Sequence, residues 1–320
     1  MCCVSLLLTS ILVSLRAVCG NVLEKSSNVL YDGRAPLTLT ADDLDNSNGP
    51  YLTCVPFPAQ DTHDAHFDFS AVKGQNESAS YYTKFQRFAL PTPLHNLPFS
   101  SEQVLAISID NTSVFVPGGG PPQLGFRRTE LIAQVNKSSS LADSVMEIGT
   151  TTFHFSIQAD ILHPLNYKHE YQIVFIEPSD GTHVFGVQLG SPFTNPTGPL
   201  PAPNAHSFKI LDHALNVLFS TPFLPLHWHN FAITVDWDNR TLAVAYSLDA
   251  APLKTFKPAT PNPTVAAGVS GDFHFGVLKL PLVDPKDTLA NQGDVVHHGI
   301  QEGTTEALLY SGVFVTKGNK

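Results

Sequence analysis

The segment Gly125-Phe126-Arg127-Arg128-Thr129-Glu130-Leu131 follows a run rich in glycine and proline and leads into an apolar stretch. Read as a β-strand, it places Arg128 and Glu130 on one face and Thr129 and Leu131 on the other, because successive side chains alternate. Two side chains on the same strand face lie about 7 Å apart, close enough for an arginine to lower or orient the charge of a glutamate. The segment therefore predicts either an exposed ion pair or a catalytic carboxylate on a concave sheet.

The same two-residue alternation recurs along the chain and predicts a domain built almost entirely of strands. In 151–158 the phenylalanines share one face and His154 takes the other, and in 169–176 Glu170 and Gln172 share a face. Segments 228–237 and 241–248 predict a hairpin around a polar turn. Further strands are expected at 28–34, 104–109, 113–116, 183–189, 273–280 and 307–315. Helical periodicity is almost absent and no repeat is visible, so we expect one all-β domain, a jelly roll or sandwich of two antiparallel sheets.

Composition narrows the possible partners. Charged residues make up only 14% of the 320 residues, and 25 prolines accompany 21 glycines, which favours strands and turns over exposed helices. The formal net charge is −10. Nucleic acid and anionic membranes need basic patches and are therefore poor partners, whereas a neutral polymer such as glucan is compatible.

The first 20 residues resemble a secretory signal peptide, which leaves residues 21–320 as a single domain. The apolar run 4–15 has the length of a signal-peptide core and is too short to span a bilayer. The alternative is a retained membrane anchor, acylated at Cys2 and Cys3. Once the leader is removed, Cys54 is the single remaining cysteine, so we expect no internal disulfide and a buried, inert thiol.

Four Asn-x-Ser/Thr sequons accompany the leader and predict a glycosylated, secreted, extracellular protein. They are Asn76, Asn111, Asn136 and Asn239.

Motif inspection argues against several chemistries. The chain lacks a dinucleotide-binding glycine motif, a P-loop, a Cys-x-x-Cys pair and a Gly-x-Ser-x-Gly elbow. His227 and His229 share a strand face but have no identifiable third ligand, and adjacent His297 and His298 point apart on a strand. We therefore expect neither a metal nor a cofactor. Glycosidic cleavage needs less, usually two carboxylates, and Glu130 and Glu170 are candidates, although each alone is equally readable as a solvated strand charge.

Several ordered motifs together resemble glycoside hydrolase family 131, a family of secreted fungal β-glucanases. The resemblance covers residues 29–315 and rests on five segments: 125–131, 152–157, 169–171, 228–232 and 301–306. It implies a β-jelly roll with a broad concave cleft that acts on β-1,3-, β-1,6- and β-1,4-linked glucan, as in degradation of the fungal cell wall. The family is generally described as inverting.

The resemblance also implies a catalytic set of two glutamates and a histidine on the concave sheet. By motif these fall on Glu130, Glu170 and His229, with the glutamates in complementary acid and base roles that the sequence leaves unassigned. Arg128 and Gln172, beside the two glutamates, and His154 are the expected substrate-binding residues. The expected partner is β-glucan, without nucleic acid or membrane after leader removal, and the expected state is a monomer.

Two other functions remain open at this point. Alginate-type polysaccharide lyases also carry an Arg-Thr-Glu-Leu strand on a jelly roll, but the lysine of their late strand is missing from Tyr310-Ser311-Gly312. A lectin-like glucan binder is compatible with the same fold, because jelly rolls support both binding and catalysis.

Overall fold

The computed structural model describes residues 28–53, 73–74, 76–87, 102–117, 120–193 and 199–318. The predicted leader and Cys54 lie outside these residues. Within them, the helices are short: α1 (Ala41–Asp45), α2 (Ala79–Tyr82), α3 (Ser139–Met146) and α4 (Leu289–Gly293). None of the described helices has the length and apolar character needed to cross a membrane.

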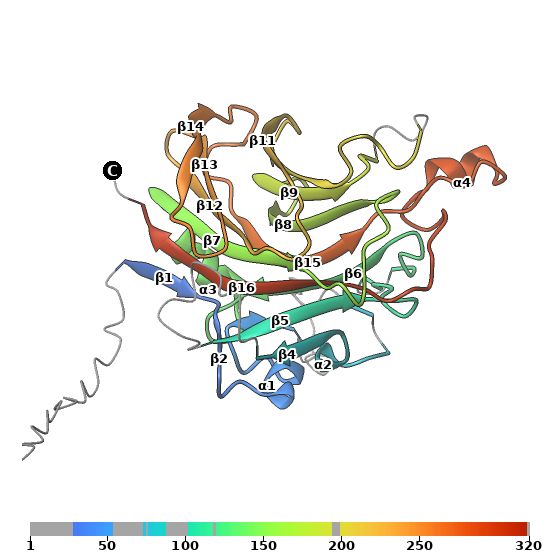
Figure 1. Ribbon diagram of the computed structural model, residues 1–320, viewed down its shortest axis with the longest axis horizontal. Helices are drawn as coiled ribbons and strands as arrows, with labels where there is room; N and C mark the ends of the chain where they lie inside the picture. Colours follow the sequence, from blue (N-terminus) through green and yellow to red (C-terminus); the bar gives the residue numbers. More distant parts are fainter. Residues whose placement is uncertain are drawn as a thin grey trace, which may run out of the picture.

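Two antiparallel sheets form the body of the molecule (Figure 1). The first sheet contains β1 (Val29–Asp32), β2 (Ala35–Pro36), β4 (Thr83–Gln86), β5 (Glu102–Ile109), β7 (Thr150–Ala159), β12 (His229–Asp236), β13 (Thr241–Leu248), β14 (Lys254–Pro261) and β16 (Glu306–Lys317). The second contains β3 (Tyr51–Leu52), β6 (Arg127–Ala133), β8 (Glu170–Pro178), β9 (Phe185–Gly190), β10 (Ser207–Asp212), β11 (Val217–Pro222) and β15 (Gly271–Lys279). The predicted all-β jelly-roll sandwich is confirmed.

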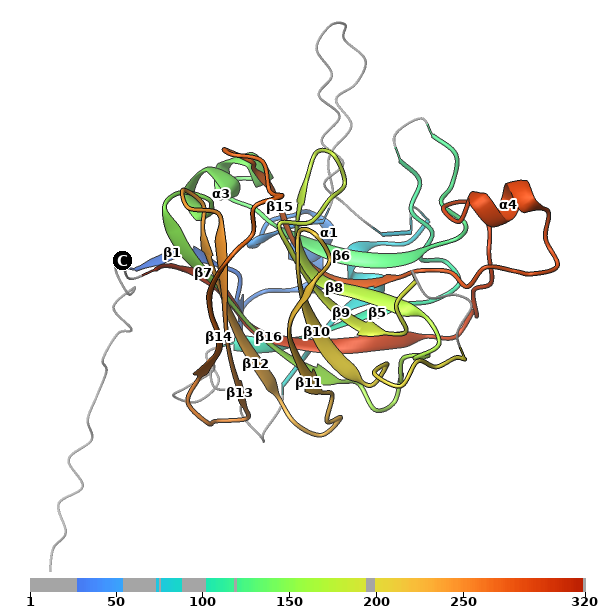
Figure 2. The same cartoon turned by 90° about the horizontal axis from the view of Figure 1, so that it is seen from above.

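Strand order brings distant segments together. The first sheet runs β14-β13-β12-β7-β16-β5-β2, with β1 paired to β16 and β4 to β5, and the second runs β11-β10-β9-β8-β15-β6-β3. The late strands β15 and β16 are thus central in their sheets. Figure 2 shows the layers from above, with α4 projecting at the end of the molecule opposite β1.

The core lies between the two sheets and follows the alternation in the sequence. Phe153 and Phe155 of β7 point inward, as do Phe273 and Phe275 of β15, and all four are fully buried. The Phe153 and Phe273 rings meet edge to face with centroids 4.9 Å apart. Burying such a side chain stabilises the fold by about 1.5–3 kcal/mol, so the sheets are held together mainly by apolar contact.

The predicted hairpin is confirmed as β12 and β13, which pair in continuous register from His229–Leu248 to Asp236–Thr241. Strands β10, β11 and β14 were not among the predicted strands. Both β11 and β14 are edge strands whose side chains are mostly exposed or half-buried, so they lack the strong apolar alternation that marks a core strand.

A buried ion pair joins the two sheets. Lys279, at the end of β15, is fully buried, and its Nζ donates to Glu306 Oε1 at the start of β16 (2.6 Å) and to Glu302 Oε2 (2.7 Å). The Tyr171 hydroxyl of β8 donates to the other oxygen of Glu306. These contacts attach the segment before β16 to the second sheet.

We predict that Lys279→Met destabilises the protein by about 3–5 kcal/mol, because Glu306 is left as an uncompensated buried charge. Urea unfolding monitored by circular dichroism measures the change. Adding Glu306→Gln should recover part of the loss. The control is Lys254→Met on the exposed edge of β14, which should change the free energy of unfolding by less than about 0.5 kcal/mol. Equal unfolding midpoints for Lys279→Met and the control would contradict the prediction.

Candidate active site

The outward face of the second sheet carries a group of polar side chains from strands that are far apart in sequence. Leu131 of β6 and Tyr171 of β8 point into the core, so Glu130 and Glu170, next to them in sequence, point outward. Strand β15 lies between β6 and β8, which places both glutamates on one surface. We refer to this surface as the polar face; it comprises Arg128, Glu130, Glu170, Gln172, Glu177, Gln188, Lys209 and His274.

Cross-strand register arranges part of the polar face as a continuous row. Arg128 pairs with Leu278, Leu278 with Gln172, Gln172 with Gln188, and Gln188 with Lys209. The row crosses five strands, from β6 to β10. Side chains directly opposite on neighbouring strands lie about 5 Å apart, so the polar side chains of β8, β9 and β10 adjoin one another, and Leu278 of β15 separates them from Arg128.

Glu130 is held as a carboxylate at one side of the row. Its side chain is buried and accepts hydrogen bonds from Arg128 Nη2 (2.8 Å) and from His274, whose Nδ1 lies 3.0 Å from Oε2. Burial alone raises the pKa of Glu130, but the charge of Arg128 and the hydrogen bond from His274 outweigh it and lower the pKa to about 2. Gly276 pairs with Glu130 on β15, where an added Cβ would lie 2.7 Å from the Glu130 Cα, so a side chain at 276 would displace the glutamate.

Glu170 lies on the other side of the row in a different environment. Its Oε1 accepts from Gln172 Nε2 (2.9 Å), and its Oε2 accepts from the backbone N–H of Phe193 (2.5 Å). Lys209 is almost fully buried on the same face, and its Nζ donates to Gly190 O (2.7 Å). Burial lowers the pKa of Lys209 to about 8, and the nearby charge of Glu170 opposes that shift. The two glutamates therefore differ in hydrogen-bond partners: Glu130 accepts from an arginine and a histidine, and Glu170 accepts from a side-chain amide and a backbone N–H.

The spacing of the two glutamates follows from the sheet geometry. Strands two positions apart are separated by about 9.6 Å, and the register offsets Glu130 and Glu170 by four residues along β15, about 13 Å. Their Cα atoms are therefore roughly 16 Å apart. The Glu170 carboxylate bonds to Gln172 of the row on its own strand. The Glu130 carboxylate is held between Arg128 of the row and His274, which lies on the side of Glu130 away from the row.

His274 is a site residue that the sequence analysis did not identify. It lies on β15 beside Glu130, and its ring stacks on Phe175 (4.8 Å between centroids), which in turn stacks on His183 (4.3 Å). Glu177 is close to both partners of Glu130, with Oε2 3.8 Å from Arg128 Nη2 and 4.0 Å from His274 Nε2. The sequence does indicate that His274 points away from the core, because it lies between the core residues Phe273 and Phe275. Alternation within one strand does not indicate which sheet contains that strand, so the contact with Glu130 could not be predicted.

The expected position of His229 is wrong. It lies on β12 of the first sheet and points into the core, fully buried between Phe208 and Tyr246. Its Nδ1 lies 2.8 Å from the Tyr246 hydroxyl, and the Leu224 N–H donates to its Nε2 (3.0 Å). Burial lowers its pKa to about 4. At neutral pH His229 is therefore an uncharged histidine of the core, and both of its ring nitrogens have hydrogen-bond partners. It does not reach the polar face.

His154 also lies away from the glutamates. It points outward from β7, but on the first sheet, so the whole sandwich separates it from the polar face. Its ring stacks on Phe314 (4.4 Å), and its Nε2 lies 3.0 Å from Thr316 Oγ1. Of the expected substrate-binding residues, Arg128 and Gln172 share the polar face and His154 does not.

No group of three metal-binding side chains occurs among the residues that the structure describes. The polar face offers carboxylates, amides, an arginine and a histidine, whose charges are compensated by one another. The chemistry available on these side chains is proton transfer and hydrogen bonding to an uncharged, hydroxyl-rich substrate.

Comparisons with known proteins identify the family of the chain. A search of curated proteins finds no match. The catalytic domain of a glycoside hydrolase family 131 β-glucanase from Podospora anserina has a similar fold, with a TM-score of 0.62 and 22% identity over 91% of this chain and 97% of that one. The catalytic domain of a family 131 protein from Coprinopsis cinerea gives 0.62 and 21% over 92% and 96%. The family model described as the glycoside hydrolase 131 catalytic N-terminal domain matches residues 29–320. The chain therefore belongs to glycoside hydrolase family 131.

Proposed function

We propose that the protein is a secreted β-glucanase that hydrolyses its substrate with Glu130 and Glu170 of the polar face. The observation that carries the proposal is that these two glutamates share one outward sheet surface, on strands that flank β15, with polar side chains between them. The similar structure from Podospora anserina is that of a β-glucanase. We take β-1,3-, β-1,6- and β-1,4-linked glucan as the candidate substrates.

We assign Glu130 the role of the ionised carboxylate, which activates the attacking water. Arg128 and His274 keep it deprotonated across the working pH range, and a group with a pKa of about 2 cannot supply the proton that the leaving oxygen needs. Glu170 then protonates the glycosidic oxygen. Water adds to the anomeric carbon, the bond to the leaving sugar breaks, and the proton taken by Glu130 balances the one given by Glu170.

We take the mechanism to be inverting, because the spacing argues against a retaining one. A glutamate side chain extends its carboxyl carbon by about 4 Å from Cα, so a Cα separation of roughly 16 Å keeps the carboxyls at least about 8 Å apart. Retaining enzymes have carboxyls about 5–5.5 Å apart, and inverting enzymes about 6.5–9.5 Å. The lower bound already exceeds the retaining distance, so direct attack of a glutamate on the sugar is disfavoured.

Secretion and glycosylation are part of the same proposal. All four sequons lie at exposed asparagines, which is the position that a glycan requires. We take the protein to act outside the cell as a monomer.

We predict that Glu130→Gln and Glu170→Gln each lower kcat/KM on laminarin, a β-1,6-glucan or a soluble cellulose derivative by about 10²–10⁴-fold, because each removes one proton-transfer group. Chromatography of released sugars measures the rate, and ultraviolet absorbance reports any unsaturated lyase product. The control is Asp42→Asn on exposed α1, which should retain wild-type activity. Wild-type-like hydrolysis by either folded glutamine variant would remove that residue from the mechanism.

The two acid–base roles are separable by chemical rescue. We predict that azide restores activity to Glu130→Ala, because azide replaces the activated water, and yields a glycosyl azide of inverted configuration. Glu170→Ala should instead recover on an aryl glucoside whose leaving group needs no proton. Proton NMR of the first product identifies the anomer. Azide rescue confined to Glu170→Ala would reverse the assignment.

We predict opposite consequences for the two histidines. His274→Ala should lower kcat/KM by about 10²-fold, as for loss of a single donor to a catalytic group, with the fold retained. His229→Ala should chiefly lower stability, by about 2–4 kcal/mol, because it opens a cavity and leaves buried polar partners unpaired. Steady-state kinetics and urea unfolding on both variants test the contrast. Loss of kcat in a stable His229→Ala protein would contradict it.

A further inference from the structure

A hollow of about 580 Å³ lies at one end of the sandwich, away from the polar face. It is bounded by the segment after α3, by the β12–β13 turn and by the loop before β15, so that it sits where β12 ends and β7, β13 and β15 begin. Its volume is in the range of small-molecule binding sites, about 300–1,000 Å³. None of the residues proposed for catalysis lines it.

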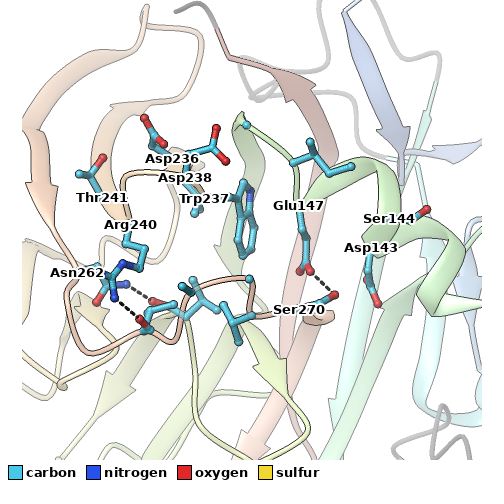
Figure 3. Close-up of a pocket in the computed structure, with 18 residues that line it drawn as sticks. Asp143, Ser144, Glu147, Asp236, Trp237, Asp238, Arg240, Thr241, Asn262 and Ser270 are labelled. Carbon is cyan, nitrogen blue, oxygen red and sulfur yellow. Dashed lines mark hydrogen bonds between the residues drawn. The ribbon is translucent and has the colours of Figure 1, made fainter.

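Trp237 forms the apolar centre of the hollow (Figure 3). Its indole N–H donates to Thr151 Oγ1 (2.9 Å), and its ring packs edge to face against the ring of Phe153. The surface that Trp237 offers to a ligand is therefore carbon only. Val235 and Val265 line the hollow beside it. An aromatic ring with aliphatic neighbours is a suitable surface for the C–H face of a sugar ring.

Polar groups flank this ring on two sides, with Glu147 on one side of Trp237 and Arg240 on the other (Figure 3). Arg240 is fixed by Nη1 hydrogen bonds to Pro263 O (3.3 Å) and Val265 O (3.1 Å). Glu147 is fixed through Oε2, which accepts from Ser270 Oγ (2.6 Å). Planar donors and acceptors held rigidly around an apolar ring match the hydroxyl groups of a saccharide.

The charge of the lining selects against anions. Three aspartates, Asp143, Asp236 and Asp238, line the hollow against one cation, Arg240. Burial raises the pKa of Glu147, which also lines it, to about 7. Phosphates and uronic acids would meet net repulsion from this surface. A neutral glycan has no such penalty.

We propose that this hollow is a second glycan-binding site, which holds a segment of the neutral polysaccharide that the polar face cleaves. The inference rests on the proposed function. Gly271, next to the hollow at Ser270, lies five residues along β15 from Gly276, the partner of Glu130, a distance of about 16 Å. A polymer is long enough to contact both places at once, and a short oligosaccharide is not. The site therefore raises affinity for polymeric glucan without taking part in bond cleavage.

The test uses the full chain with Glu130→Gln, which we expect to bind glucan while hydrolysing it about 10²–10⁴-fold more slowly than the wild type. Calorimetry with laminarin compares this protein with two double variants. Glu130→Gln/Trp237→Leu keeps an apolar side chain but loses the aromatic ring, and should bind about tenfold more weakly. Glu130→Gln/Trp237→Phe keeps a ring and should bind nearly as well as Glu130→Gln. Phe256→Leu in the same background changes an exposed aromatic on β14 outside the hollow and should have no effect.

Kinetics in the active protein give an independent readout. Trp237→Leu should raise KM for laminarin while leaving kcat/KM on an aryl disaccharide unchanged, since the short substrate cannot span to the hollow. If Trp237→Leu fails to fold, Ala267→Arg fills the hollow from an exposed rim position and should give the same result.

Equal laminarin affinity and KM with and without these substitutions, in folded proteins, would overturn the second site while leaving the proposed function intact. Absence of both glucan binding by Glu130→Gln and hydrolysis by the wild type would overturn the proposed function and this inference with it.

Discussion

Apolar packing between the two sheets is the constraint from which the remaining features follow. Phe153 and Phe273 meet across the interface, and every strand that contributes such a side chain must turn its neighbouring residues outward. The polar face exists because Leu131 and Tyr171 are committed to the core. Lys279 and Glu306 add a buried ionic link between the sheets, and it fixes the start of β16, an interior strand of the first sheet, against β15.

The two glutamates lie on one surface of this rigidly packed sheet, but their surroundings differ. Glu130 is tied to Arg128 and His274, so that its charge persists, whereas Glu170 is held by Gln172 and a backbone N–H. Two carboxylates with different environments are what acid–base hydrolysis of a glycoside requires. Because the two glutamates lie on strands β6 and β8, which flank β15 in one packed sheet, their separation is set by strand spacing and register rather than by loops.

The end of the sandwich offers a different kind of surface. Trp237 and its valine neighbours provide apolar area there, and Arg240 and Glu147 provide fixed polar groups, without the paired glutamates of the polar face. The polar face carries the two glutamates that we propose for catalysis, and we propose that the hollow binds glycan without taking part in bond cleavage. One polysaccharide chain can be recognised by both because strands carry the two surfaces at a fixed distance.

The sequence by itself determined the all-β class, the β12–β13 hairpin and the placing of Arg128 with Glu130, and of Glu170 with Gln172, on one face of their strands. Each of these depends only on alternation within one strand, which is local. The family was also readable from its ordered motifs, and the family model confirms it. The edge strands β11 and β14 could not be predicted from the sequence, because their side chains are mostly exposed or half-buried and show no apolar alternation. Their extended conformation depends on pairing with neighbouring strands.

Only the tertiary structure decided which histidine joins the glutamates. His154, His229 and His274 all alternate with apolar residues, yet one points outward from the first sheet, one points into the core, and one lies beside Glu130. Alternation fixes a side chain's face relative to its own strand, but the sheet that the strand joins, and which face is core, depend on long-range pairing. The row from Arg128 to Lys209 likewise comes from the register of five strands, which no single segment encodes.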